Sequence, residues 1–159
     1  MKNIFFIFTI LCGTAYADTF SVESAKKLMY EGKRELATEI IITLANNGDL
    51  NAKYHLAAQY YIGLVVKKDI NKASDIWKIA CSAGHQESCA NYAVTLSDLG
   101  MHQEAEKAYL YAIKQFNDFV SMSNLSTLYN NNEWPGYSPQ KAQLWKQRAN
   151  DIENQSKND

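Results

Sequence analysis

The sequence has no marked excess of one charge and no run of basic residues. Its 159 residues carry 16 Lys and Arg against 17 Asp and Glu, a formal net charge of −1. Proteins that bind nucleic acid or an anionic membrane through electrostatics present a basic patch or stripe. The near-neutral balance therefore argues against nucleic acid and against a membrane as the main partner.

Signs of a catalytic centre are also scarce. The three histidines, His55, His85 and His102, show no H-E-x-x-H spacing and no acidic partner fixed by pattern. General acid–base catalysis needs a second positioned group, and the pattern names none. We therefore predict no catalytic residue, no metal site and no cofactor.

One hydrolase motif occurs twice. The pattern S-x-x-K, which opens a class of serine hydrolases that act on β-lactams, is present at Ser24 to Lys27 and at Ser138 to Lys141. Neither S-D-N nor K-T-G accompanies it, and about one match is expected by chance in a chain of this composition. Both matches are therefore discounted.

The first 17 residues have the pattern of an export signal. Lys2 gives a positive start, residues 4–11 form an apolar run too short to span a bilayer, and residues 15–17 read A-x-A. We expect cleavage after Ala17 and a periplasmic or secreted protein. A lipoprotein with Cys12 as its anchor is the alternative, but Leu11 stands where such signals carry a small residue.

Beyond this segment there is no strand pattern, low-complexity tract or linker, and apolar residues recur at helical spacing. Ala52, Leu56 and Tyr60 fall on one helical face, while Gly63 and Gly84 stand where two helices would end. This spacing predicts a pair of helices.

The helix pair recurs along the chain. Corresponding small residues stand at Ala37, Ala73, Ala105 and Ala142, at spacings of 36, 32 and 37 residues. A pair of this size cannot bury its apolar face alone, so the recurrence predicts a stack of four pairs.

The stop signals give the limits of these pairs. Helices are predicted at residues 19–31 and 34–47, 51–63 and 69–83, 86–99 and 102–115, and 118–130 and 138–153. Without residues 1–17, 159 − 17 = 142 residues are left, enough for one domain with a continuous core. We assign residues 18–153 to a helical repeat domain and residues 154–159 to a polar C-terminal tail.

A family resemblance enters at residues 52–84. This segment resembles the Sel-1-like repeat, a relative of the tetratricopeptide repeat with a longer loop inside the helix pair. The first and third units look more like plain tetratricopeptide repeats. The fourth departs further, because Ser126 replaces the usual small apolar residue and residues 130–136 form a long, irregular turn. The resemblance implies an all-α fold, a right-handed α-solenoid of about four antiparallel helix pairs.

Two cysteines lie in the predicted domain, Cys81 and Cys89. In an oxidising compartment they are expected to pair, and the exported Sel-1-like proteins that this segment resembles share the spacing. The disulfide would join the second and third units. Free thiols are one alternative. A zinc site is another, but it needs about four ligands and only His85 lies between the cysteines.

The tyrosines suggest a binding surface. Tyr60, Tyr92, Tyr109 and Tyr129 stand at repeat core positions. Tyr54, Ala58 and Tyr61 form a separate stripe, which in tetratricopeptide repeats lines the concave face. Equivalent positions in the other units are Lys26, Met29, Val94, Ser97, Thr127 and Asn130. In the alternative interpretation Tyr54 and Tyr61 pack across the repeat joint, and an exposed Trp134 in the loop of residues 130–137 becomes the next candidate.

The function that this pattern favours is an exported protein-binding module that takes a protein or peptide on its concave face. By resemblance, one hypothesis is an immunity protein that inhibits an envelope-acting toxin. An envelope adaptor and a secreted host-interacting effector are the alternatives within this class. A weak β-lactam-binding hydrolase is the alternative from another class.

Overall fold

The computed structural model describes residues 20–157 of the chain. The expected export signal of residues 1–17 and the last two residues of the expected tail lie outside the described residues. No helix among the described residues is both long enough and apolar enough to cross a membrane.

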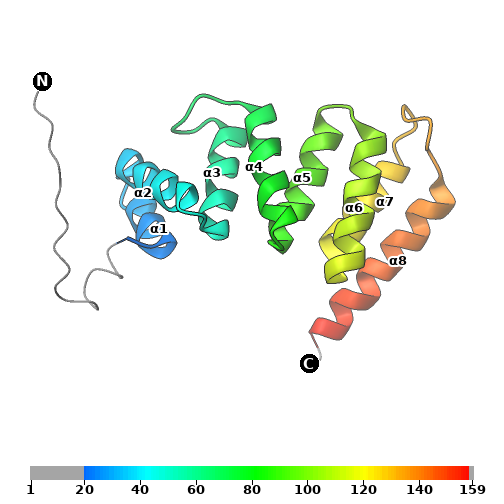
Figure 1. Ribbon diagram of the computed structural model, residues 1–159. Helices are drawn as coiled ribbons and strands as arrows, with labels where there is room; N and C mark the ends of the chain where they lie inside the picture. The colour runs from blue at the N-terminus through cyan, green and yellow to red at the C-terminus, as the bar shows by residue number, and fades with distance from the viewer. Residues whose placement is uncertain (1–19, 158–159) are drawn as a thin grey trace, which may run out of the picture.

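Eight α-helices and no strand make up the described part of the chain (Figure 1). They are α1 (Val22–Tyr30), α2 (Arg34–Asn46), α3 (Leu50–Ile62), α4 (Ile70–Ser82), α5 (Gln86–Asp98), α6 (His102–Phe116), α7 (Phe119–Tyr129) and α8 (Pro139–Ser156). Each helix packs against the next, so the pairs follow one another from α1 at one end to α8 at the other (Figure 1). This is the predicted all-α solenoid, and its four pairs are called units one to four below.

Local capping explains where the helices begin and end. Asp69 accepts a hydrogen bond from the Lys72 amide at 2.9 Å and so starts α4. Gly84 follows α4 with φ of +94°, which lets the His85 amide bond back to the Ala80 carbonyl at 3.0 Å. Similar signals limit the other helices, which is why the predicted boundaries agree with the structure to within about three residues.

Small residues bring the helices together. Ala25, Ala57 and Ala93 on the first helices of units one to three are fully buried, as are Ala37 and Ala73 on the second helices. A side chain of one methyl group lets two helix backbones approach closely, and larger residues then fill the space between pairs.

Unit four closes the loop between its helices with the same backbone hydrogen bond as unit two. The Asp69 amide donates to the Tyr60 carbonyl at 2.9 Å, and the Ser138 amide donates to the Tyr129 carbonyl at 2.8 Å. Ser126, which stands where the family pattern has a small apolar residue, is buried and donates to the Ala142 carbonyl at 2.7 Å. The hydroxyl therefore joins α7 to α8 where an alanine would only pack.

Trp134 is buried, so the prediction that it is exposed is wrong. Only 5% of its surface is accessible. Its ring centroid lies 5.5 Å from that of Tyr129 and 6.3 Å from that of His102, at the start of α6. Gly136 packs so closely on the indole that a Cβ there would lie 2.4 Å from it. The loop of unit four therefore adds a large side chain to the core between units three and four.

Candidate partner-binding surface

Cys81 and Cys89 form a disulfide, as predicted. Cys81 lies in the last turn of α4 and Cys89 in the first turn of α5, so the bond joins unit two to unit three. Both cysteines are buried against Ala112 and Phe116 of α6. The disulfide therefore holds the joint against which the predicted tyrosine stripe lies.

Tyr54 and Tyr61 pack across that joint. Tyr61 donates its hydroxyl to the Asp98 carboxylate on α5, and its ring centroid lies 5.6 Å from that of Trp77. This hydrogen bond, together with partial burial and the Asp98 charge, raises the pKa of Tyr61. The Tyr54 ring centroid lies 5.4 Å from that of His85, the residue that caps α5.

Both tyrosines are half-buried in one cluster with Ala57, Ala73 and Trp77. The structure therefore shows Tyr54 and Tyr61 packed across the repeat joint, which was the alternative interpretation of the sequence. Each ring also keeps part of its surface accessible, and a role in binding a partner stays a prediction.

The other predicted positions differ in exposure. Val94 and Ser97 are half-buried on α5, whereas Thr127 and Asn130 are exposed at the end of α7. Thr127 and Asn130 line a groove of about 550 Å³ between α7 and α8. Hydroxyl and amide groups stand in the groove wall beside apolar surface of Pro139 and Ala142, so the groove offers hydrogen-bonding groups as well as apolar contact.

Ala58 lies in an apolar hollow between α1 and α3, called the α1–α3 hollow. Its volume is about 180 Å³. The lining residues come from α1, α2, α3 and the loop that follows α3: Ala25, Lys26, Met29, Ile41, His55, Ala58, Gln59, Ile62, Leu64 and Val65. Lys26 and Met29 are the positions that the sequence pattern equates with the stripe on α3. The hollow therefore brings together predicted positions from two units.

Exposed apolar side chains stand at the mouth of this hollow. Ile62 is 64% exposed and Leu64 is 59% exposed. Gly63, between them, ends α3 with φ of +77°, and a Cβ there would lie 2.6 Å from the Cβ of Lys68. The tight turn at Gly63 therefore sends the loop back past α3 and leaves Leu64 and Val65 beside the hollow.

The sequence analysis did not single out the apolar side chains of this loop as a candidate binding surface. The signal was present, because Leu64, Val65 and Val66 form an apolar run inside a connection, where polar residues are usual.

His55 gives the hollow a neutral polar group. Burial lowers the pKa of His55, and the nearby Lys26 lowers it further. The imidazole is therefore uncharged at neutral pH. The Lys26 ammonium lies 3.3 Å from the Glu23 carboxylate, so the charge beside the hollow is balanced on α1.

The two S-x-x-K matches have structural roles. Ser138 caps α8 by accepting from the Lys141 amide at 3.4 Å, and the Lys141 ammonium lies 4.7 Å from the centre of the Tyr129 ring. Ser24 exchanges capping hydrogen bonds with Ser21 at the start of α1. Among the described residues no group of three or more His, Cys, Asp or Glu is placed to hold a metal ion.

Solved structures share this fold. One is c5321, a protective antigen present in uropathogenic Escherichia coli strains that displays an SLR fold, with a TM-score of 0.66 and 19% identity. Another is a Sel1 repeat protein from Oxalobacter formigenes, with a TM-score of 0.63 and 23% identity. A third is MamA MSR-1, with a TM-score of 0.60 and 17% identity. No protein-family model matches the sequence, and no curated protein matches it.

The likeness covers most of this chain and less of its neighbours. It extends over 86% of this chain in the first two cases and 88% in the third. The chain spans 32% of c5321, 60% of the Oxalobacter protein and 81% of MamA MSR-1. At these identities the comparison shows the fold, and that fold is the Sel1-like repeat solenoid that the sequence resemblance implies.

Proposed function

We propose that the chain is an exported protein-binding module whose partner docks on the first helices of units one and two. The observation that carries the proposal is the α1–α3 hollow, with Ile62 and Leu64 exposed at its mouth. Neighbouring apolar side chains that stay exposed beside a concave site are typical of a surface that another protein covers. The repeat fold, which presents one extended surface, supports the same function.

Export is part of the proposal. The Cys81–Cys89 disulfide supports it, because disulfides persist in the periplasm and outside the cell. Protein purified from the periplasm should begin at Asp18 and should react with a thiol reagent only after reduction. An intact Lys2 or free thiols in that protein would contradict export by this route.

Affinity isolation of the mature protein from envelope and secreted fractions tests the binding surface. Leu64→Asp should abolish recovery of the partner, because it puts a charge at the mouth of an apolar hollow. Leu144→Asp is the matched control, since Leu144 is 47% exposed on α8, away from the hollow. Equal recovery by both variants would exclude the α1–α3 hollow as the partner site.

The tyrosine stripe is tested separately from its packing role. Tyr54→Ala and Tyr61→Ala should each weaken binding by about 2 kcal/mol or more if the stripe touches the partner. Because both rings pack across the joint, stability is measured on the same samples by circular dichroism. Tyr61→Phe keeps the ring and removes the hydrogen bond to Asp98, so it should keep most of the affinity. Loss of stability and binding in parallel would assign the rings to packing alone.

A finer proposal within this class is a dedicated inhibitor, an immunity protein that neutralises an envelope-acting toxin. The resemblance to exported Sel-1-like proteins and the single repeat domain support it. Co-expression of the isolated partner in the periplasm tests it. Wild type should protect the cells, whereas a stable Leu64→Asp variant should not. A partner that is harmless when expressed alone would favour an adaptor or a secreted effector instead.

A further inference from the structure

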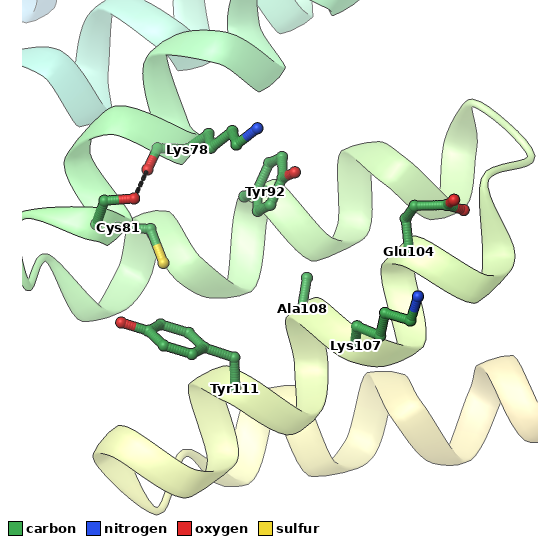
Figure 2. Close-up of a pocket in the computed structure, with 8 residues that line it drawn as sticks. Lys78, Cys81, Tyr92, Glu104, Lys107, Ala108 and Tyr111 are labelled. Atoms are coloured by element: carbon green, nitrogen blue, oxygen red, sulfur yellow. Dashed lines mark hydrogen bonds between the residues drawn. The ribbon is translucent and has the colours of Figure 1, made fainter.

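A second hollow lies farther along the solenoid, at the junction of α4, α5 and α6 (Figure 2). Its volume is about 340 Å³, and its wall is mostly apolar. Figure 2 shows the Tyr92 ring and the Ala108 methyl group between the helices, with Tyr111 below them. We call this the α4–α6 hollow. It shares no lining residue with the α1–α3 hollow.

The charged groups around the α4–α6 hollow are mainly positive. Lys78 comes from α4, and Glu104 and Lys107 come from α6. Among the described residues, none of these three side chains forms an ion pair. Two ammonium groups and one carboxylate therefore leave one positive charge beside an apolar surface, which favours an anionic partner.

Size indicates what kind of group fits. Pockets for small molecules have volumes of roughly 300 to 1,000 Å³ and enclose most of the ligand. The α4–α6 hollow is at the lower end of this range and is open to solvent on one side. It suits one large side chain of a partner chain better than a small molecule that must be enclosed.

We propose that the α4–α6 hollow is a second docking site, which takes an aromatic side chain from an acidic segment of a partner protein. The ring would lie against Tyr92 and Ala108, and the flanking carboxylates would meet Lys78 and Lys107. An aromatic side chain gives the largest apolar contact that such a hollow can accept at low entropic cost. With the α1–α3 hollow, the solenoid would carry two separate docking sites.

The disulfide belongs to this site. Cys81 lines the α4–α6 hollow, and its bond to Cys89 joins α4 to α5, which supply two of the walls. Reduction should therefore loosen the hollow and weaken docking there.

Nuclear magnetic resonance titration of the protein purified from the periplasm tests the proposal, with three blocked tripeptides as probes. The peptide Glu-Trp-Glu should shift the amide signals around Tyr92, Ala108 and Tyr111. Lys-Trp-Lys, which reverses the charge, and Glu-Ala-Glu, which removes the ring, should bind at least tenfold more weakly. Equal binding of all three peptides, or no shift at millimolar Glu-Trp-Glu, would overturn the proposal.

Charge variants locate the site. The double variant Lys78→Glu and Lys107→Glu should weaken Glu-Trp-Glu binding at least tenfold and improve Lys-Trp-Lys binding. Lys114→Glu is the control matched in charge to Lys107→Glu alone, because Lys114 is exposed on α6 and does not line the hollow. If Lys114→Glu weakened peptide binding equally, the loss would come from net charge alone, and the proposed site would be wrong. Binding at the α1–α3 hollow is measured independently through Leu64→Asp, so either site can fail alone.

Discussion

The loops inside units two and four share one backbone frame and differ in what they do with their apolar side chains. In both units the residue that caps the second helix donates its amide to a tyrosine carbonyl, of Tyr60 or Tyr129. In both, a lysine in the first turn of the second helix lies over that tyrosine ring, at 4.2 Å for Lys72 and 4.7 Å for Lys141.

The side chains of the two loops then diverge. Trp134 of unit four is buried against Tyr129, whereas Leu64 of unit two stays exposed beside the α1–α3 hollow. A repeat frame therefore fixes where a loop begins and ends. The residues inside the loop decide whether it completes the core or leaves an apolar surface exposed.

The largest difference between the two loops should be in stability. Trp134→Ala should lower the free energy of unfolding by about 3–5 kcal/mol, because it removes a buried indole and leaves a cavity between units three and four. Leu64→Ala should change it by less than about 0.5 kcal/mol, because Leu64 is exposed. Urea unfolding followed by circular dichroism measures both. Equal losses would mean that the two loops contribute to the core alike.

Reduction of the disulfide should lower the stability of unit two and leave that of unit four nearly unchanged. Cys81 and Cys89 are eight positions apart, and closing a loop of this size stabilises by about 2.6 kcal/mol in the chain-entropy model. Because unit four has no such bond, amide exchange should become faster in α4 and α5 and change little in α7 and α8. Hydrogen exchange with and without reductant measures this.

The control for that experiment is a variant with both cysteines changed to alanine, which reductant should not affect. Uniform acceleration along the chain would show that the disulfide supports the whole solenoid instead of one joint.

A smaller effect should appear in unit four at alkaline pH. Burial and then the hydrogen bond to the Glu106 carboxylate raise the pKa of Tyr129. A raised pKa in the folded state means that this stabilisation is complete below the unfolded value of about 10 and is lost as pH rises beyond it. The wild type should therefore lose about 1 kcal/mol more than Tyr129→Phe between pH 8 and pH 11.

Thermal unfolding at each pH gives this difference. Lysine titration contributes equally to wild type and variant, so only the difference between the two proteins is interpreted. Parallel curves would show that the Tyr129 hydroxyl does not couple to folding.

Periodicity and stop signals were enough to predict the helices. The prediction of residues 69–83 for α4, observed at Ile70–Ser82, rests on helical spacing of apolar residues and on Gly84 as the stop signal. These signals act within a few residues of the chain, so they can be read without knowing the fold. The disulfide prediction followed from the two cysteines of the domain in an expected oxidising compartment and from the family resemblance.

The loops could not be predicted in the same way. Whether Trp134 turns inward depends on the space that His102 and Tyr129 leave, and these residues come from different helices. The exposure of Leu64 depends on the turn at Gly63 and on α1, which is about 40 positions earlier. Helical periodicity describes one helix face at a time, so it assigned Tyr54 and Tyr61 to one stripe. It could not show that Tyr61 contacts α5 and that Tyr54 contacts His85, the residue that caps α5.

The central claim is that the exposed loop of unit two contacts a partner and the closed loop of unit four does not. Site-specific photo-crosslinking in cells that produce the protein tests it most directly, with a benzophenone amino acid placed at Leu64 or at the exposed Pro135. The account predicts one discrete crosslinked protein from Leu64, absent from Pro135 and lost when Ile62→Asp is added. Equal crosslinking from both positions, or none from Leu64, would contradict it.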